Sequence, residues 1–387
     1  MREDWLGAGQ RKNFPLGELC QLVSRGTAPN YDENGYFYAI GQKCVQVSGF
    51  VPEAARRHEP LGGREVRPRP GDVLLNSTGV GTIGRSCVFP LDGDYVVDSH
   101  VTVIRPGELL DARWLNATLQ SHWGQRYLDT HCFIGSTGQV ELSRSELLRV
   151  PISLPSLAEQ QRIAEILDEL DEQLARLRNL RAKTENWLQG MRRRLISETR
   201  DGELVAIGHL GRVVTGKTPD VGPRLGHGHS IPFVTPSEIV DGEAVLDSTR
   251  EAWRGEANVV EVPSGSTLVV CIGFGTGKVG LLEHRACVNQ QINAVVPGGQ
   301  VDPHFLFESI CEASAKVKAA SSLQVTPILN KSTFSQIQLF VPSFSRQKEI
   351  SSVLRQVRSE LDQFDVNIEK VQHLKRALMN GLLAGSD

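Results

Sequence analysis

Long apolar runs are missing from this 387-residue chain. No segment approaches the roughly 18 consecutive apolar residues that a membrane-spanning helix needs, so we expect neither a membrane span nor a charged-then-apolar leader. Cysteine is also scarce. The seven cysteines are scattered, odd in number and never form a Cys-x-x-Cys pair. This usage argues against a disulfide framework and a zinc ribbon, and we expect a reduced, cytoplasmic protein.

Sequence signatures of catalysis are absent as well. The segment 273–278 is similar to a phosphate-binding loop, but Ile272 stands where the first glycine belongs and Val279 follows the lysine. A β-turn with glycines at positive φ explains the segment better. No lysine has an acidic residue two places before it, as nucleases usually require, and no Asn/Asp-Pro-Pro-aromatic loop for adenine methylation occurs. We predict a non-enzymatic protein without a cofactor.

The chain does contain a stretch of about 45 residues that occurs twice, and Pro155 and Pro342 mark a lag of 187 positions. Each copy continues without a gap as a long amphipathic pattern. Such a helix cannot bury its apolar stripe alone, so two matched copies can bury their stripes against each other. Ser156 followed by Glu159 predicts an N-cap with a capping box, and Ser343 keeps the cap in the second copy.

Apolar residues recur in both copies with the 4-3 alternation of a coiled coil. The seam residues that begin the two helices are Ile163, Leu167, Leu170, Leu174, Leu177, Ile350, Leu354, Val357, Leu361 and Phe364. The seam continues to positions 195 and 382, and only Arg181, Thr184 and Lys375 in it are polar. Forty helical residues form a rod of roughly 60 Å. A hairpin that only staples two domains together would show the same periodicity.

A fainter duplication precedes each helix. Gly26-Thr27-Ala28-Pro29 matches Gly216-Lys217-Thr218-Pro219, and Gly79-Val80-Gly81-Thr82 matches Gly273-Phe274-Gly275-Thr276. Short β-like runs come first and a helix follows, which favours an α+β fold. Those helices are expected at 112–128 and 303–317. Residues 42–70 and 237–264 have nothing in common, so one frame presents two different surfaces. We predict a first domain at 1–150, a first helix at 151–199, a second domain at 200–340 and a second helix at 341–387.

Charge is nearly balanced, with a formal net charge of −3. Residues 1–150 hold 16 basic and 17 acidic side chains, and residues 200–340 hold 11 and 14. Because phosphate neutralisation supplies most non-specific affinity, this balance argues against a stand-alone DNA binder. Arginine outnumbers lysine 31 to 11, which suits bidentate contacts to guanine and phosphate. A GC-rich genome would produce the same bias.

Basic side chains gather in and near the two divergent segments, where loops can carry them to bases or phosphates. The candidates are Lys43, Arg56, Arg57, Arg64, Arg67 and Arg69 in the first domain and Lys217, Arg224, His227, His229, Arg250 and Arg254 in the second. Exposed arginines are often merely solvated, so position alone does not decide their role. The two histidines could also be read as a metal pair. No third ligand follows at a convincing spacing, and we predict no metal site.

The run 155–167, ending near Trp187-Leu188-Gln189-Gly190-Met191, closely resembles the conserved regions of type I restriction–modification specificity subunits. Segments 81–85 and 275–278 look like the recurring turn of that family's target-recognition domains. The resemblance covers essentially the whole chain. It implies two α+β target-recognition domains joined by two long helices in an antiparallel coiled coil. It also implies a non-catalytic subunit that reads an asymmetric, interrupted target in double-stranded DNA and docks two DNA adenine methyltransferase subunits. A translocating restriction subunit is a further partner that the sequence leaves open.

The alternative from another class is a coiled-coil protein-interaction adaptor with two pseudo-repeated domains and no nucleic acid. The two hypotheses differ in one observable, because only a specificity subunit produces a sequence-selective footprint when the methyltransferase is present. For such a subunit, two readers on one face of a duplex must lie about 34 Å apart, or a multiple of it. A rigid antiparallel rod can fix that separation.

Overall fold

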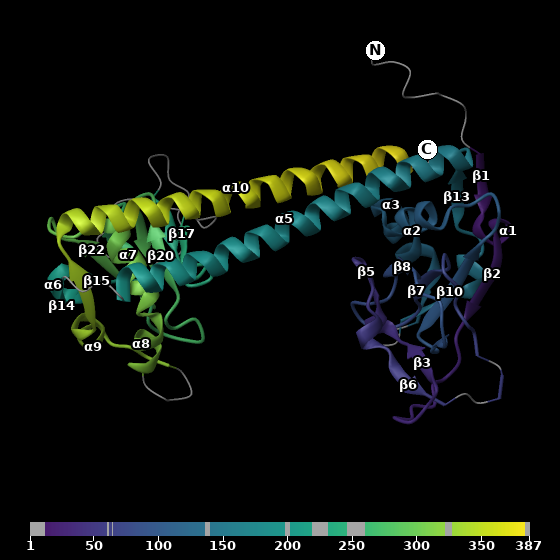
Figure 1. Cartoon of the computed structure of the whole chain (residues 1–387), viewed down its shortest axis with the longest axis horizontal. Coiled ribbons are helices and arrows are strands. Elements are labelled where there is room, and N and C mark those ends of the chain that lie inside the picture. Colours follow the sequence, from purple (N-terminus) through teal and green to yellow (C-terminus); the bar gives the residue numbers. More distant parts are fainter. Residues whose placement is uncertain are drawn as a thin grey trace, which may run out of the picture. The chain divides into compact units, whose positions relative to one another are not determined.

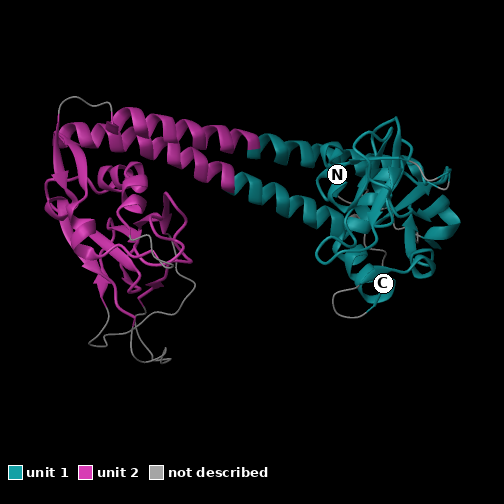
Figure 2. Cartoon of the chain, turned by 90° about the horizontal axis from the view of Figure 1, so that it is seen from below, with its two compact units in different colours: residues 1–178, 366–387 teal, residues 179–365 magenta. Residues whose placement is uncertain are grey.

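The computed structural model describes residues 12–59, 62–63, 65–135, 140–197, 202–218, 231–245, 260–321 and 327–383. The chain forms two compact units, residues 1–178 with 366–387 and residues 179–365 (Figure 2). Figure 1 labels two long helices, α5 (Leu157–Ser197) and α10 (Phe344–Leu383), and Figure 2 shows that each contributes one segment to each unit. Among the described residues, no helix is long and apolar enough to cross a membrane.

Strands of the first unit form a four-stranded antiparallel sheet, ordered β2-β10-β7-β8, and a three-stranded sheet, ordered β6-β3-β9. Three two-stranded pairs, β1-β13, β4-β5 and β11-β12, accompany them. The strands are β1 (Lys12–Pro15), β2 (Cys20–Arg25), β3 (Phe37–Ile40), β4 (Val45–Gln46), β5 (Gly49–Phe50), β6 (Arg56–His58), β7 (Val73–Asn76), β8 (Ser86–Val88), β9 (Tyr95–Val97), β10 (Val101–Pro106), β11 (Phe133–Ile134), β12 (Glu141–Leu142) and β13 (Pro151–Leu154). The helices are α1 (Leu16–Leu19), α2 (Ala112–Gln120), α3 (His122–Tyr127) and α4 (Arg144–Leu147), with single helical turns at Gln42–Cys44, Pro52–Ala54 and Leu128–Cys132.

The second unit repeats this plan. Its central sheet is ordered β15-β22-β19-β20-β17, its three-stranded sheet β16-β21-β18, and its remaining pair is β14-β23. The strands are β14 (Gly202–Ala206), β15 (Gly211–Thr215), β16 (Phe233–Val234), β17 (Glu243–Val245), β18 (Glu261–Val262), β19 (Thr267–Val270), β20 (Val279–Leu282), β21 (Ala286–Val288), β22 (Ile292–Pro297) and β23 (Gln338–Pro342). The helices are α6 (Ile207–Leu210), α7 (Pro303–Glu312), α8 (Ser314–Ala319) and α9 (Lys331–Gln336).

Divergent segments add different strands to a shared frame. In the first unit β3 runs parallel to β9, and β6 pairs with β3. In the second unit β16 runs parallel to β21, but β18 pairs with β21 instead. Strand β17, also from the divergent segment, extends the central sheet beside β20. The observed fold is therefore α+β, as predicted, and it presents a different third strand in each unit.

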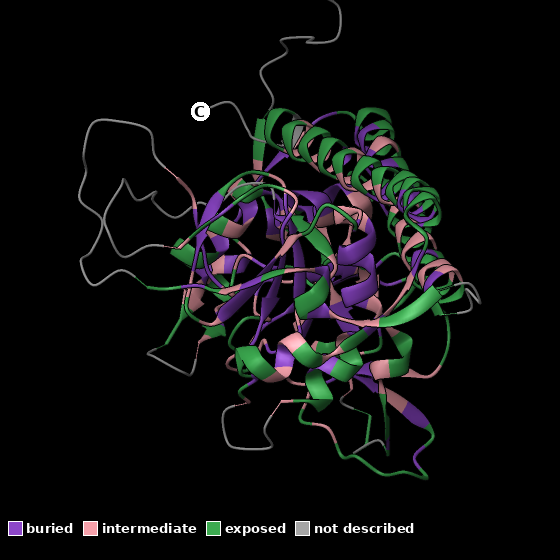
Figure 3. Ribbon diagram, turned by 90° about the vertical axis from the view of Figure 1, so that its left-hand side faces the viewer, coloured by how far each residue is buried: buried purple, intermediate pink, exposed green. Residues whose placement is uncertain are grey.

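The predicted helices at 112–128 and 303–317 are each broken into two, which corrects the sequence-based expectation. Ser121 ends α2 and caps α3, because its hydroxyl accepts a hydrogen bond from the Gly124 amide at 3.0 Å. A Cβ at Gly124 would clash with the Thr118 carbonyl, so the chain turns there on a glycine. In the second unit the break falls at Ala313. Figure 3 shows buried residues gathered on the sheets and the helices that cover them.

A buried glutamine joins each globular part to the long helix that follows it. The Gln160 side-chain oxygen accepts a hydrogen bond from the Asp111 amide at 2.8 Å, and its nitrogen donates to the carbonyl five residues earlier at 2.9 Å. Gln347 makes the same two contacts, with Asp302 at 2.9 Å and with the carbonyl five residues earlier at 2.9 Å. Asp111 and Asp302 also cap α2 and α7. The duplication thus extends to individual hydrogen bonds.

Apolar positions of the heptad seam face the interior of each unit. In the first unit Leu170, Leu174 and Val371 form one apolar cluster between α5 and α10. In the second unit Leu188 and Leu354 belong to the main core. The other seam positions are buried at Ile163, Leu167, Ile350, Val357 and Leu361 and half-buried at Leu177 and Phe364. The amide of Glu159 donates to the Ser156 hydroxyl at 3.3 Å, which confirms the predicted N-cap of α5.

Two polar seam residues make ion pairs across the helices. Lys375 contacts Asp171 at 2.5 Å in the first unit, and Arg181 contacts Asp365 at 2.6 Å in the second. The second pair lies ten residues later along α5 and ten residues earlier along α10, so the helices run antiparallel. Pairing satisfies charges that would otherwise be costly in an apolar seam.

The second unit holds a buried ionic cluster where α7 meets the two long helices. Glu308 on α7 is only 2% exposed. Arg358 on α10 donates to both of its carboxylate oxygens, at 3.0 Å for the Nη2 contact, and Arg192 on α5 lies 3.8 Å away. Arg358 also donates to the carbonyl of Gly242, in the turn before β17. Burial by itself would lower the pKa of Arg358, but the Glu308 carboxylate outweighs burial and raises it.

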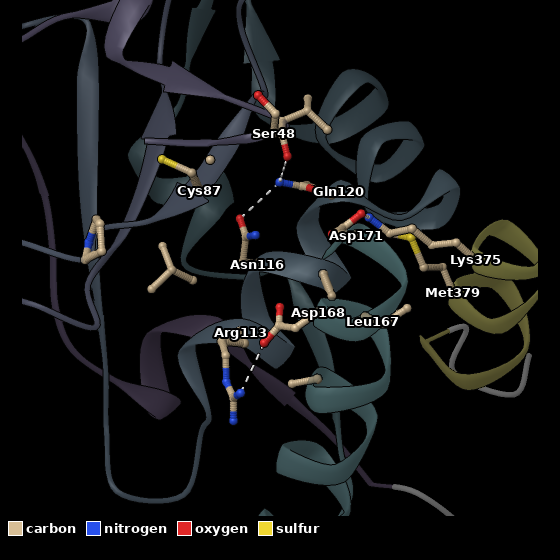
Figure 4. A pocket seen from close by; sticks show the side chains of 16 residues that line it. Ser48, Cys87, Arg113, Asn116, Gln120, Leu167, Asp168, Asp171, Lys375 and Met379 are labelled. Atoms are coloured by element: carbon tan, nitrogen blue, oxygen red, sulfur yellow. Dashed lines mark hydrogen bonds and ion pairs between the residues drawn. The ribbon is translucent and has the colours of Figure 1, made fainter. Parts of the chain in front are cut away.

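The equivalent place in the first unit is a cavity of about 270 Å³ (Figure 4). The three equivalent positions hold Ala117, Asp171 and Met379, and all three line the cavity. Asp171 pairs with Lys375 at its edge. One repeat therefore places a buried ion cluster at these three positions, while in the other repeat the equivalent residues line a cavity.

Candidate nucleic-acid interface

The first divergent segment places its arginines on the sheet β6-β3-β9. Register pairs Arg56 with Ala39 and Arg57 with Tyr38. Residues directly opposite in an antiparallel pair point to the same face, and successive residues alternate between faces. Arg56 and Arg57, adjacent in sequence, therefore lie on opposite faces of the sheet.

Two of the candidate arginines share one face of this sheet and lie over aromatic rings. The Arg56 guanidinium lies 3.7 Å from the centre of the Tyr31 ring, and the Arg67 guanidinium lies 4.4 Å from that of Phe37. Phe37 packs with Ala39 beneath them. A cation–π contact of this kind restrains the guanidinium group, whose N–H groups suit a bidentate acceptor such as phosphate or guanine.

A buried aspartate anchors the Tyr31 ring. The Tyr31 hydroxyl lies 3.4 Å from Asp98, which also accepts a hydrogen bond from the His100 amide at 2.8 Å. Burial and the Asp98 carboxylate raise the pKa of Tyr31, so the phenol stays protonated and donates. In the second unit Asn289 makes the equivalent backbone contact, because its side-chain oxygen accepts from the Gln291 amide at 2.8 Å. The landmark is conserved in geometry although the charge differs.

Arg57 belongs to the opposite face. Its guanidinium lies 4.7 Å from the centre of the Tyr38 ring, and its Nη1 donates to the Gly35 carbonyl at 3.2 Å. The Tyr38 ring in turn packs against Tyr95, with ring centres 5.6 Å apart. The sequence cluster is thus split into two sets by strand register.

The remaining candidates lie elsewhere or outside the described residues. Lys43 is exposed in the helical turn Gln42–Cys44, and Lys217 is exposed just after β15. Arg69 borders a cavity that also touches the start of α5. The candidates Arg64, Arg224, His227, His229, Arg250 and Arg254 lie outside the described residues. The described part of the chain contains no cluster of metal-ligating side chains.

Sequence reasoning missed Tyr31, which belongs to this surface, and Arg85, which lies beside a glycine turn. Tyr31 was not considered, although it lies in the aromatic-rich run that precedes β3. Arg85 follows the first glycine turn, and its guanidinium donates to the Gly81 carbonyl at 2.6 Å and to the Gln46 side chain at 2.9 Å. The recurrence of a cation after both turns was the signal that could have pointed to Arg85.

Both globular parts match one family model. The model for the type I restriction modification DNA specificity domain covers residues 10–186 and again residues 200–370. The chain belongs to this type I specificity family. Its duplicated architecture is thus two copies of the family's domain, and each copy includes most of the long helix that follows it.

Two curated relatives illustrate the range of similarity within the specificity family. The chain is 26% identical over 196 residues to the type I restriction enzyme HindI specificity subunit of Haemophilus influenzae, which covers 48% of this chain and 42% of that protein. It is 20% identical over 416 residues to the putative type I restriction enzyme MjaX specificity subunit of Methanocaldococcus jannaschii, covering 96% and 92%. The match therefore spans less than half of HindI and nearly all of MjaX.

Solved structures agree on the fold of this specificity chain. The S subunit of a type I restriction–modification system from M. genitalium superposes with a TM-score of 0.64 at 15% identity and covers 97% of this chain and 96% of its own. A chain solved in work on the complex assembly and conformational transition of the type I R-M system gives a TM-score of 0.60 at 17% identity, covering 97% of both. At these identities the likeness establishes the fold alone.

Proposed function

We propose that this specificity chain reads an asymmetric, interrupted sequence in double-stranded DNA, with each unit reading one part. The observation that carries the proposal is the different third strand that the two divergent segments add to one shared frame. Phosphate contacts carry no sequence information, so selectivity must come from side chains on the parts that differ. Two different surfaces on equivalent frames would then recognise two different halves of the DNA target.

Arg56 and Arg67 are the proposed base or phosphate contacts of the first unit. Their guanidinium groups are exposed, share one face and are held by ring stacking. A bidentate arginine suits the O6 and N7 acceptors of guanine. Pre-orientation lowers the entropy lost when such a contact forms.

The long helices are the proposed docking site for two DNA adenine methyltransferase subunits, which supply the chemistry. Neither domain has excess positive charge. Partners that help to hold the duplex would supply the missing phosphate contacts. An assembly that acts on cellular DNA works in the cytoplasm, and a translocating restriction subunit remains a further possible partner.

Mapping methylated adenines tests the proposal. The chain and its methyltransferase are expressed in a host that lacks both, and the methylated sequence is compared with that of cells carrying the methyltransferase alone. We expect one interrupted target that appears only with the chain present. Replacing residues 200–340 with the equivalent part of a relative should rewrite one half of the target and leave the other half unchanged. A swap that altered both halves together would refute the modular assignment.

The adaptor hypothesis makes the opposite prediction. A chain that only joins proteins leaves the methylated sequence independent of both divergent segments and produces no sequence-selective footprint. That result with an intact, assembled complex would replace the recognition function with a scaffold function.

A further inference from the structure

One tight turn occurs in both units with the same hydrogen bonds. In the first unit the Thr82 amide and hydroxyl both donate to the Gly79 carbonyl, at 3.0 and 3.2 Å. In the second unit Thr276 donates in the same way to Gly273, at 3.0 and 2.6 Å. Both glycines have positive φ, +100° and +96°, which side chains rarely tolerate. The turn is therefore a shared, internally braced element.

Each turn presents an apolar side chain at its tip. Phe274 is 98% exposed and Val80 is 83% exposed, and they are the two most exposed large hydrophobic residues in the described part of the chain. A single exposed apolar side chain is ordinary. Here the two most exposed side chains occupy the same position of a duplicated turn, and neither contributes to a core. Chance exposure of single residues does not explain this recurrence. The braced turn holds an apolar group toward solvent in both units.

Lysine side chains flank the Phe274 turn. The stem of Lys278 lies 3.7 Å from where a Cβ on Gly275 would be, and Lys318 of α8 lies directly over Gly277. Within the described residues neither ammonium group pairs with a carboxylate. In the first unit Arg85 occupies the position that follows the turn. An apolar tip beside these cations matches the surface of a duplex, where base steps lie between rows of phosphates.

We propose that Phe274 is a wedge that enters a base step of the bound DNA duplex, while Lys278 and Lys318 contact the neighbouring phosphates. This inference rests on the proposed DNA-reading function. Apolar side chains that enter base steps partly unstack them and bend the duplex. Val80 is shorter, so in the first unit the equivalent tip touches the groove without separating base pairs. The two halves of the target are then deformed to different degrees.

The substitution Phe274→Ala tests the wedge without threatening the fold, because the ring is almost fully exposed. The assembled complex is bound to its mapped target, in which 2-aminopurine replaces one base of the second half at a time. The methylated adenine is left unreplaced, since base flipping there would also raise fluorescence. Binding of the wild-type complex should unstack one base step and so raise the fluorescence of 2-aminopurine placed there, which defines the bright step. Phe274→Ala should lose that signal and weaken binding about tenfold, in line with the value of one stacked base.

Matched variants separate the parts of the proposal. Leu204→Ala removes another exposed apolar side chain of the same unit and should change neither signal nor affinity. Lys278→Gln with Lys318→Gln should weaken binding to all duplexes and lower the salt dependence by about two charges. At saturating protein this double variant should retain the bright step.

Three results would overturn the wedge. They are the absence of any bright step with wild type, a bright step that survives Phe274→Ala, and a loss of methyltransferase assembly by Phe274→Ala with unchanged DNA affinity. The last would place a protein partner on the ring. A non-target duplex of equal length is run in parallel. A Phe274-dependent bright step there, without target preference, would support the wedge and refute selective reading.

Discussion

Arg67 and Arg56 show how neighbouring rings prepare a guanidinium for recognition. Each lies on an aromatic ring whose own position is set by the sheet or by Asp98. An exposed cation–π contact contributes about 0.5–1 kcal/mol, which is enough to restrict a long side chain. The contact matters less for stability than for the direction in which the N–H groups point.

Replacing Arg67 with Ala should cost about 1–3 kcal/mol of DNA binding. If the side chain reads guanine, the methylated target should lose its preference at one position. If it meets a phosphate, binding to all sequences should weaken alike. Competition between target and singly substituted duplexes distinguishes these outcomes.

Arg57→Ala is the matched control for that measurement, because Arg57 stacks on Tyr38 at the opposite face of the sheet. We expect it to leave selectivity unchanged. The reverse pattern, with Arg57 required and Arg67 dispensable, would move the reading surface to the other face.

Helices α5 and α10 depend on a seam whose two charged residues, Arg181 and Lys375, are paired. Leu174 and Leu361 are both 5% exposed within their units. An aspartate at either site would be an unpaired charge in an apolar seam, so Leu174→Asp or Leu361→Asp should cost several kcal/mol. Thermal unfolding and co-purification with the methyltransferase measure the effect. Leu374→Asp, at a site that is 51% exposed, is the control and should be nearly neutral.

The cluster of Glu308 and Arg358 offers a second test at the level of packed elements. Arg358→Met leaves a buried carboxylate without its main partner and should destabilise the chain by about 3–5 kcal/mol. Adding Glu308→Gln removes the orphaned charge and should recover most of that loss. Denaturant midpoints of the single and double variants decide the point, and equal instability of both would show that the ion pair is not the cause.

For the whole molecule, matched helices predict a ruler. Inserting four residues at matched positions of both α5 and α10 adds about 6 Å of helix, close to two base pairs. The methylated target should keep both half-sequences and lengthen its gap. Methylation mapping with the lengthened chain is the measurement, and an unchanged gap would favour a flexible tether.

Insertion into one helix alone provides the control. It shifts the apolar seam of one helix out of register with the seam of the other. The unfolding midpoint should therefore fall, and the gap of the DNA target should not lengthen. A one-helix insertion that behaved like the paired insertion would show that the seam does not set the spacing.

Much of this architecture follows from local pattern. The repeat at a lag of 187 positions, the heptad seam and the serine caps each depend on residues close in sequence, so the two frames, the paired helices and their polar exceptions were predictable. The segment 273–277 was also correctly read as a turn with glycines at positive φ. The basic candidates of the second divergent segment, which lie outside the described residues, stay predictions.

Other features depended on contacts between distant residues, which no local period encodes. Register decided that Arg56 and Arg57 face opposite sides, and strand pairing decided that β6 joins β3 while β18 joins β21. Packing decided whether a junction became the Glu308 ion cluster or a cavity, although the helices there are repeats. Exposure of Phe274 likewise came from the tertiary fold, because burial depends on which distant surfaces reach a side chain.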